Sequence, residues 1–227
     1  MKAMILAAGK GERMRPLTNQ IPKPLLDVAG KPLIVWHLEK LAQANFKEVI
    51  INHAHLGEMI EAFIGDGSKW NLKITYSREG SPLETAGGIK KALPLIGDQP
   101  FLVVNADIYT DFDYASLKNR NLNDYKGHLV MVKNPKHHPD GDFVLKNNQI
   151  ELEGQERLTF SGIAIYQPEI FEDINIELVA KLAPILKKLI EAKCISGEIY
   201  EGLWFDIGTP ERLNEINLFL KKNLKVN

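Results

Sequence analysis

Residues 1–18 read Met-Lys-Ala-Met-Ile-Leu-Ala-Ala-Gly-Lys-Gly-Glu-Arg-Met-Arg-Pro-Leu-Thr, and Pro22-Lys23-Pro24 follows a few residues later. The apolar run at 3–6 predicts a buried strand. It passes directly into a loop of small residues with two glycines and several cations. Glycine N–H groups and guanidinium groups are well suited to holding phosphates. The stretch therefore predicts a strand followed by a binding loop for a nucleoside triphosphate.

The glycines of this loop do not fit two common phosphate-binding motifs. The dinucleotide fingerprint would need glycine at Met14, and a P-loop would need Gly-Lys followed by serine or threonine. A tight turn in a solvated basic loop is the structural alternative. The prolines beside Lys23 restrict the backbone, so that a single lysine is presented in a fixed position. Phosphate binding is favoured by the cations in and after the loop: Lys10, Arg13, Arg15 and Lys23.

Strands and helices alternate through the first half of the chain. Apolar spacing predicts strands at 3–6, 48–52, 73–77 and 101–105, and helices at 33–44, 56–64 and 87–93. In the less regular second half it predicts strands at 129–132, 143–145 and 158–166, and helices at 180–192 and 211–220. This alternation is typical of an α/β fold with an open, mostly parallel sheet, which binds ligands at the carboxyl ends of its strands.

Composition and charge limit the possible partners. The 227 residues are 44% hydrophobic and 25% charged, with a formal net charge of −1, so no global basic surface favours nucleic acid or an anionic membrane. The lone Cys194 cannot form an internal disulfide. The apolar start is too short for a signal-peptide core, and no segment approaches the roughly 20 apolar residues of a membrane span. We expect a soluble, cytoplasmic protein.

Two aspartates follow apolar segments. Asp107 comes after the strand predicted at 101–105, and Asp206 lies within Trp204-Phe205-Asp206-Ile207-Gly208-Thr209-Pro210. Two carboxylates can share Mg²⁺, which completes its octahedron with phosphate oxygens and water. Each aspartate alone could equally be a cap or turn residue. The pair, together with the phosphate loop, favours a metal site.

Two further segments carry polar groups that could meet a ligand. Residues 81–88 predict a rigid turn that opens a helix, and Glu79 just before it could accept a base N–H or could simply be exposed. His137-His138, with Asp140 and Asp142, lacks the spacing of a zinc site and favours a polar loop near a second substrate or plain surface. No order of Ser, His and Asp or of Cys and His supports covalent catalysis.

Taken together, the motifs resemble those of the sugar-1-phosphate nucleotidyltransferase family. They are Leu6-Ala7-Ala8-Gly9-x-Gly11-x-Arg13-Met14-Arg15-Pro16-Leu17-Thr18, Pro22-Lys23-Pro24, Pro82-Leu83-Glu84-Thr85-Ala86-Gly87, Asn105-Ala106-Asp107 and Phe205-Asp206-Ile207-Gly208-Thr209. The resemblance implies a Rossmann-like three-layer α/β/α fold with a mostly parallel mixed central sheet. It also implies a reaction between a nucleoside triphosphate and a sugar 1-phosphate that releases pyrophosphate.

Within that family the chain is most similar to the short uridylyltransferases that act on N-acetylmuramate α-1-phosphate in peptidoglycan recycling. Mannose-1-phosphate guanylyltransferases and glucose-1-phosphate nucleotidylyltransferases are alternatives of the same enzyme class. A nucleotide-sensing regulatory subunit without turnover is the alternative from another class. The resemblance implies one domain over 1–227, with a nucleotide half at about 1–110, a sugar-phosphate half at about 111–200, and a returning metal strand and terminal helix at 201–227.

The resemblance also implies residue roles. Arg13, Lys23 and Asp107 are expected to be catalytic, and Asp107 and Asp206 to hold Mg²⁺. The expected nucleotide-binding residues are Leu6, Ala8, Gly9, Gly11, Glu12, Arg13, Lys23, Glu79, Thr85 and Gly87. The expected substrate-binding residues are Asn105, Gly141, Asp142, Ser161 and Lys181. The expected partners are UTP and a sugar 1-phosphate, with a monomer favoured and no obligate protein partner.

One departure concerns the cation that meets the sugar phosphate. Many family members carry a Glu-Lys-Pro segment whose lysine has this role, and residues 151–157 offer no such sequence. Either another cation, Lys181 or Arg157, is expected to substitute for it, or the sugar is bound in a different position. N-acetylmuramate also carries a lactyl carboxylate, which calls for a further donor or cation, and Lys181, His137 and His138 are the candidates.

Overall fold

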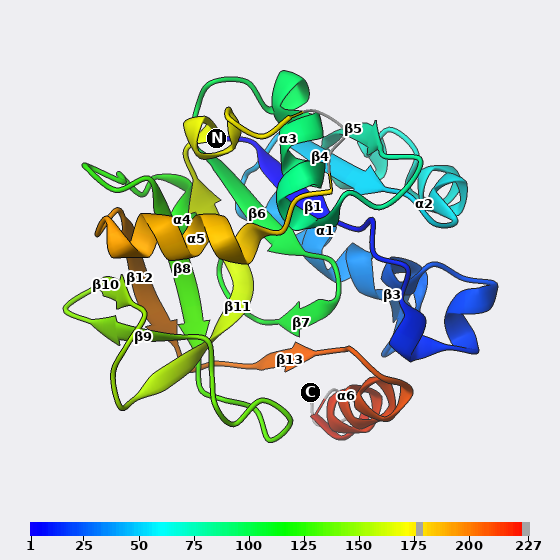
Figure 1. Cartoon of the computed structure of the whole chain (residues 1–227). Coiled ribbons are helices and arrows are strands. Elements are labelled where there is room, and N and C mark those ends of the chain that lie inside the picture. Colours follow the sequence, from blue (N-terminus) through cyan, green and yellow to red (C-terminus); the bar gives the residue numbers. More distant parts are fainter. Residues whose placement is uncertain (176–178, 224–227) are drawn as a thin grey trace.

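A nine-stranded mixed sheet forms the centre of the computed structural model, which describes residues 1–175 and 179–223 (Figure 1). In spatial order its strands are β5 (Lys73–Arg78), β4 (Glu48–His53), β1 (Ala3–Leu6), β6 (Phe101–Asn105), β11 (Arg157–Tyr166), β8 (Gly127–Val132), β12 (Ile195–Tyr200), β10 (Gln149–Glu151) and β9 (Phe143–Lys146). Two small sheets pair β2 (Asp27–Val28) with β3 (Lys31–Pro32) and β7 (Ile108–Thr110) with β13 (Trp204–Asp206). The α/β fold class predicted from the sequence is confirmed.

The sheet has two parts with different pairing. Strands β5, β4, β1 and β6 are parallel, and each of the strands predicted in the first half is present. Strand β11 then runs antiparallel to both β6 and β8, while β12 runs parallel to β8. The carboxyl ends of β1, β4 and β6 therefore meet at one edge, as expected for a ligand site in such a sheet.

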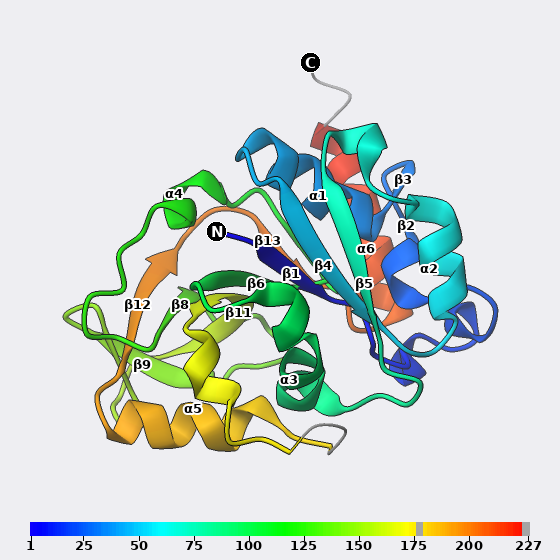
Figure 2. The same cartoon turned by 90° about the horizontal axis from the view of Figure 1, so that it is seen from above.

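Helices cover both faces of the sheet. They are α1 (Leu33–Gln43), α2 (Gly57–Ile64), α3 (Glu84–Ile96), α4 (Ala115–Lys118), α5 (Leu182–Glu191) and α6 (Pro210–Asn223). Seen from above, α3 and α5 lie on one face, and α1 and α4 lie on the other (Figure 2). No helix of the described residues has the length and apolarity needed to cross a membrane.

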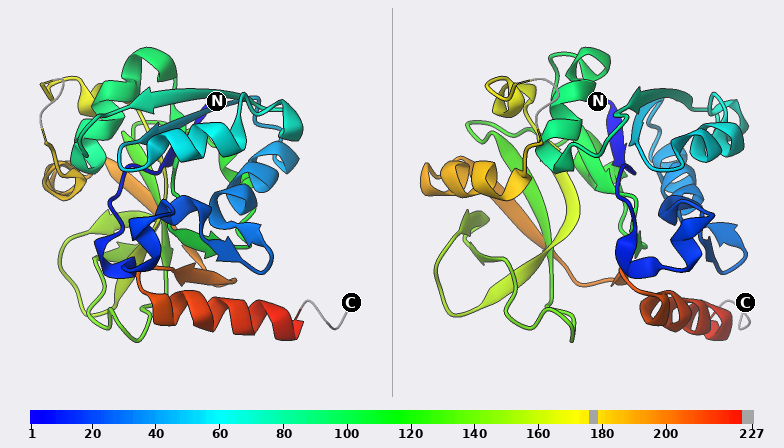
Figure 3. Two further views of the ribbon diagram at one scale, coloured as in Figure 1. Left: turned by 90° about the vertical axis from the view of Figure 1, so that its right-hand side faces the viewer. Right: turned by 45° about the vertical axis from the view of Figure 1, so that its right-hand side comes forward.

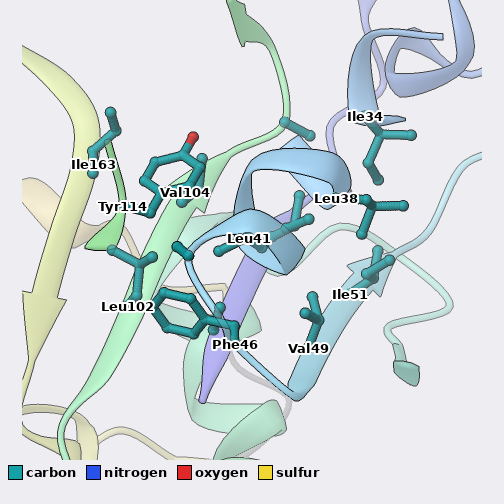
Figure 4. Packing of buried hydrophobic residues seen from close by; sticks show 14 of the residues in the cluster. Ile34, Leu38, Leu41, Phe46, Val49, Ile51, Leu102, Val104, Tyr114 and Ile163 are labelled. Carbon is teal, nitrogen blue, oxygen red and sulfur yellow. The ribbon is translucent and has the colours of Figure 1, made fainter. Parts of the chain in front are cut away.

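Alternate side chains of the central strands enter two separate cores. In β1, Ala3 and Ile5 belong to the core under α1, whereas Met4 belongs to the core under α3 and α5. The core under α1 is packed with branched and aromatic side chains, including Leu38, Phe46 and others (Figure 4). Burial on both faces explains why these strands are continuous apolar runs.

A third, smaller core joins the two ends of the chain. Helix α6 contributes Ile216 and Leu220, which cluster with Leu26 and Val28 from the segment after Lys23 and with Ile207 after β13. Figure 3 shows α6 lying apart from the main sheet, below the loops of the N-terminal region. This core fixes the C-terminal segment against the N-terminal loops.

Several elements differ from the sequence prediction, which also lacks the short β2, β3, β7, β10 and α4. The helix predicted at 87–93 is longer, because α3 begins at Glu84 and continues past Pro94 to Ile96. Strand β12 was not predicted, since Gly197 and Glu198 interrupt its apolar pattern. The glycine is required by packing: a Cβ on Gly197 would lie 2.5 Å from Cδ1 of Ile150.

Candidate active site

Two adjoining cavities lie at the carboxyl ends of the central strands. The first has a volume of about 740 Å³ and is walled by the loop after β1, by the turn before α3 and by the end of β6. The second, of about 360 Å³, lies between β11, β13 and the loop after β8. Arg13, Asn105 and Asp107 line both cavities. A group bound at these three residues would face both compartments.

The loop after β1 has the tight, close-packed shape that its glycines suggest. Gly11 has a φ of 63°, and a Cβ there would lie 2.8 Å from Cγ2 of Thr18. The Thr18 hydroxyl donates to the Gly11 carbonyl at 2.7 Å, and the Met14 N–H donates to the same oxygen at 2.9 Å. A larger residue at Gly11 would disrupt both the backbone conformation and this contact.

Lys23 reaches into the junction of the cavities. It begins a short 3-10 turn, in which the N–H groups of Leu25 and Leu26 donate to the carbonyls of Pro22 and Lys23. Its Nζ donates to Oδ2 of Asp107 at 2.7 Å, and its side chain is only 11% exposed. The ammonium is thus held in place by the backbone turn and by an ion pair.

Strand pairing brings Asp206 beside Asp107. Strand β13 runs antiparallel to β7 with Asp206 opposite Ile108, and the Ile207 N–H donates to the Asp107 carbonyl at 2.9 Å. Oδ2 of Asp206 accepts from Arg212 at 2.6 Å and lies 3.2 Å from Nε2 of His137. Asp206, at the end of β13, therefore lies beside Asp107, which directly precedes β7, although the two are almost a hundred positions apart in the chain.

These two carboxylates could hold a hard divalent cation. They are oxygen donors, and each already lies against a cationic side chain, Lys23 for Asp107 and Arg212 for Asp206. Mg²⁺ is commonly bound by one or two carboxylates plus substrate phosphates. Within the described residues no group of three or more His, Cys, Asp or Glu side chains is arranged around a metal position. The donor set therefore fits a cation that is shared with a phosphate ligand.

Asn52 lines the first cavity, and Glu79 supports it from behind. Oδ1 of Asn52 accepts from the Ala7 N–H at 2.9 Å, and its Nδ2 donates to Oε1 of Glu79 at 2.6 Å. Oε2 of Glu79 accepts from the Leu83 N–H at 2.8 Å. Burial raises the pKa of Glu79, and these two hydrogen bonds oppose the shift. This chain of bonds joins the loop after β1 to the turn before α3.

The structure brings most of the expected nucleotide-binding residues together. The following line the first cavity: Leu6, Ala8, Gly9, Gly11, Glu12, Arg13, Lys23 and Thr85. Glu79 is buried behind the wall with both carboxylate oxygens bonded, so it is placed to support Asn52 and Leu83. The Gly87 N–H, at the start of α3, donates to the Ala180 carbonyl at 3.1 Å.

The expected substrate-binding residues divide into three groups. Asn105 lines both cavities, and Ser161 lines the second. Gly141 and Asp142 lie behind His138, which itself lines the second cavity. Lys181 is exposed at the start of α5 and is not among the described residues that line either cavity.

Arg157 is not a cavity cation either. Its guanidinium donates to the carbonyls of Leu152, at 2.8 Å, and of Asp142. Among the described residues, the basic side chains that line the second cavity are Arg13, His137 and His138. Neither residue expected to replace the family lysine is therefore brought to the junction, where Arg13 and Lys23 lie.

Three supporting residues were missed by sequence reasoning. Asn52 is a polar residue at the end of an apolar strand, a signal that could have been noticed. Gly88 allows the Asn52–Glu79 contact, because a Cβ there would lie 2.4 Å from Oε1 of Glu79. Gly162 has a φ of 81°, and its Cβ would lie 2.5 Å from Nδ2 of Asn105. Nothing in the local sequence identifies these contacts, since each joins residues of separate elements.

Comparison with known proteins identifies the family. Residues 2–223 match the nucleotidyl transferase family. The chain is 54% identical over 222 residues to the N-acetylmuramate alpha-1-phosphate uridylyltransferase of Neisseria meningitidis serogroup B, covering 95% of this chain and 96% of that protein. It is 30% identical to the mannose-1-phosphate guanyltransferase of Hypocrea jecorina, covering 93% of this chain but only 62% of that longer protein.

Solved structures agree on the fold. A putative glucose-1-phosphate thymidylyltransferase from Bacillus anthracis, in complex with a sucrose, matches with a TM-score of 0.84 and 21% identity, over 96% of this chain and 94% of that one. HddC from Yersinia pseudotuberculosis, complexed with GMP-PN, matches with a TM-score of 0.79 and 24% identity, over 96% of this chain and 99% of that one. The chain belongs to the nucleotidyl transferase family and is a sugar-1-phosphate nucleotidyltransferase.

Proposed function

We propose that the protein transfers a uridylyl group from UTP to N-acetylmuramate α-1-phosphate, yielding the UDP-sugar and pyrophosphate, as a cytoplasmic step of peptidoglycan recycling. The choice of substrates rests on the 54% identity to a uridylyltransferase of that specificity along nearly the whole of both chains. The geometric observation in its favour is that two cavities meet at Arg13, Asn105 and Asp107. That arrangement suits two substrates that react at a shared phosphate.

The loop after β1 would hold the triphosphate in the first cavity, and the second cavity would hold the sugar. A phosphate oxygen of the sugar 1-phosphate attacks the α-phosphorus in line, a new P–O bond forms, and the bond to the β-phosphate oxygen breaks to release pyrophosphate. The attacking phosphate is already ionised at neutral pH, so no general base is required. Catalysis then depends on alignment and on charge stabilisation.

Arg13 and Lys23 are placed to supply this stabilisation. Arg13 lines both cavities, and Lys23 is held at the junction by Asp107. Cations that are fixed before reaction stabilise developing charge without reorganising. Mg²⁺ held by Asp107 and Asp206, when bound, would neutralise charge on the triphosphate oxygens. Asn105 and the Ser161 region would orient the sugar.

We also propose a division of labour within a single domain. Residues up to about 110 would bind the nucleotide, residues from about 111 to 200 the sugar phosphate, and the segment from 201 onward would return the second metal-binding aspartate. The protein would act as a monomer without an obligate protein partner. Size-exclusion chromatography with light scattering tests the last point, and a stable dimer at assay concentration would contradict it.

Release of pyrophosphate tests the reaction. UTP, GTP, dTTP and ATP are each combined with N-acetylmuramate, N-acetylglucosamine, mannose and glucose 1-phosphates, with and without Mg²⁺. We expect the highest kcat/KM with UTP and N-acetylmuramate α-1-phosphate, and loss of turnover without the metal. A preference for GTP and mannose 1-phosphate would replace the proposal with the activity named for the relatives at 30% identity. Absence of turnover with every pair would support a nucleotide sensor.

A further inference from the structure

The loop that connects β8 to β9, residues 133–142, is fixed to the sheet by its own side chains; we call it the histidine loop. Nδ2 of Asn134 donates to the carbonyls of Pro139 at 2.9 Å and Arg157 at 3.0 Å, while its Oδ1 accepts from the Thr159 hydroxyl at 2.9 Å. Gly141, with a φ of 62°, allows the backbone to pass close to Asn134. The loop is therefore held in a defined position over the second cavity.

Within this loop, Asp142 fixes the ring of His138. Oδ2 of Asp142 accepts from the Phe160 N–H at 2.8 Å, and its Oδ1 lies 3.1 Å from Nε2 of His138. Arg157 binds the backbone carbonyl of Asp142. Since Nε2 is turned to Asp142, Nδ1 is the ring nitrogen available to a ligand.

The neighbouring His137 is in a different situation. Its Nε2 lies 3.2 Å from Oδ2 of Asp206 and also contacts Arg212. It therefore belongs to the group around the candidate metal carboxylate. His138 lines the same cavity but is bonded to Asp142 instead. Two adjacent histidines thus face one cavity with separate partners.

The charges on the cavity wall indicate what His138 could bind. Asp107 is paired with Lys23 and Asp206 with Arg212, and Arg13 lies at the junction where a phosphate would be transferred. Arg13 and His137 belong to this charged group. Apart from them, His138 is the basic side chain among the described residues that line the second cavity. A ligand carboxylate there would place the His138 ring between two carboxylates, its own and that of Asp142.

We propose that His138 recognises a carboxylate substituent on the sugar, and that Asp142 is its positioning residue. This inference rests on the proposed function, because N-acetylmuramate differs from N-acetylglucosamine by a lactyl ether that ends in a carboxylate. The sugar phosphate would lie at the junction, with the lactyl group directed to the histidine loop. Lys181, outside both cavities, has no part in this recognition.

The test compares two variants, His138→Asn and His137→Asn, on the 1-phosphates of N-acetylmuramate and N-acetylglucosamine. Preference is the ratio of the two kcat/KM values. Where N-acetylglucosamine 1-phosphate turns over too slowly to measure, preference is instead the ratio of its Ki as an inhibitor to the KM for N-acetylmuramate 1-phosphate. We expect His138→Asn to lower the preference roughly tenfold, which corresponds to about 1.4 kcal/mol. His137→Asn should lower turnover of both substrates and keep the preference within about twofold.

Asp142→Asn provides a second variant. As a positioning change it should raise the KM for N-acetylmuramate 1-phosphate more than it lowers kcat, and more than it changes the KM for N-acetylglucosamine 1-phosphate. Melting temperatures check that each variant is folded.

The outcomes separate the inference from the proposed function. A wild-type protein that prefers N-acetylmuramate 1-phosphate, together with a His138→Asn variant of unchanged preference, overturns the inference alone. A wild-type protein with equal kcat/KM for the two sugars also overturns it. No pyrophosphate release with N-acetylmuramate 1-phosphate refutes the proposed function, and the inference with it.

Discussion

Exchanging the carboxylate and the amide between positions 52 and 79 tests whether their contact supports the first cavity. In the native protein Asn52 donates to Glu79 at 2.6 Å and accepts from Ala7, and Glu79 accepts from Leu83. Asn52→Asp alone places two carboxylates in contact. Glu79→Gln alone places the NH₂ group of the new side chain against another donor, either the NH₂ group of Asn52 or the N–H of Leu83. The double variant lets Gln at position 79 donate to Asp at position 52, and both backbone N–H groups keep an acceptor.

The expected magnitudes follow from burial, since Asn52 is 2% and Glu79 7% exposed. Two like charges about 4 Å apart repel by about 4 kcal/mol at an effective dielectric constant of 20. Loss of a buried hydrogen bond to a charged group costs about 1.5–3 kcal/mol. The double variant keeps the single negative charge of the native pair. The coupling free energy between the two positions should therefore be about 3 kcal/mol or more in favour of the double variant.

Urea unfolding of the four proteins at pH 7.5 measures this coupling, and the KM for the nucleoside triphosphate measures its effect on the cavity. Both single variants should unfold at lower urea concentrations. The double variant should recover most of the lost stability and most of the lost affinity for the nucleoside triphosphate. The deficit of Asn52→Asp should shrink as the pH falls, because a shared proton relieves repulsion between carboxylates. Additive effects of the two changes would refute the reasoning.

Three further predictions concern the candidate metal carboxylate Asp107, the second cavity and pH. Asp107→Asn should lower kcat at least roughly 100-fold, measured by pyrophosphate release, with a melting temperature close to that of the native protein. Gly162→Ala, whose Cβ would meet Asn105, should raise the KM for the sugar phosphate, whereas Gly80→Ala, with a φ of 72° and open space around it, should affect stability alone. Burial lowers the pKa of His37 to about 4, so the free energy of unfolding should fall by about 3 kcal/mol as the pH drops from 6.5 to 4, and His37→Asn should flatten that slope in urea titrations.

The parallel half of the sheet was predictable because its strands are buried on both faces. Strand β1 has no polar residue and β6 has one only at its end, Asn105, so the sequence shows short apolar runs. In the second half, β12 carries Ser196, Gly197 and Glu198 between its apolar ends, and Glu198 pairs with Arg120 instead of facing solvent freely. A pattern of that kind depends on partners from other strands, and the local sequence does not contain them.

Some parts of the candidate site could be predicted from the sequence, and others could not. The loop after β1, Lys23 and Asp107 could be located because glycines, a proline-flanked lysine and a strand end are local signals. The orientation of Glu79 was not predictable, since a carboxylate at a strand end can face either a ligand or a buried amide. The structure shows that Asn52 and Leu83 bind both of its oxygens.

The two candidate metal carboxylates illustrate why the C-terminal segment is part of the candidate site. Asp107 and Asp206 become neighbours only through pairing of β7 with β13, and that pairing is supported by the small core that joins α6 to the segment after Lys23. Arg212, on α6, holds Asp206. Bringing such distant segments together costs chain entropy, and the buried apolar contacts of this core offset that cost. Helix α6 therefore holds the two ends of the chain together and also positions Asp206. The geometry where the two cavities meet thus depends on the packing of α6.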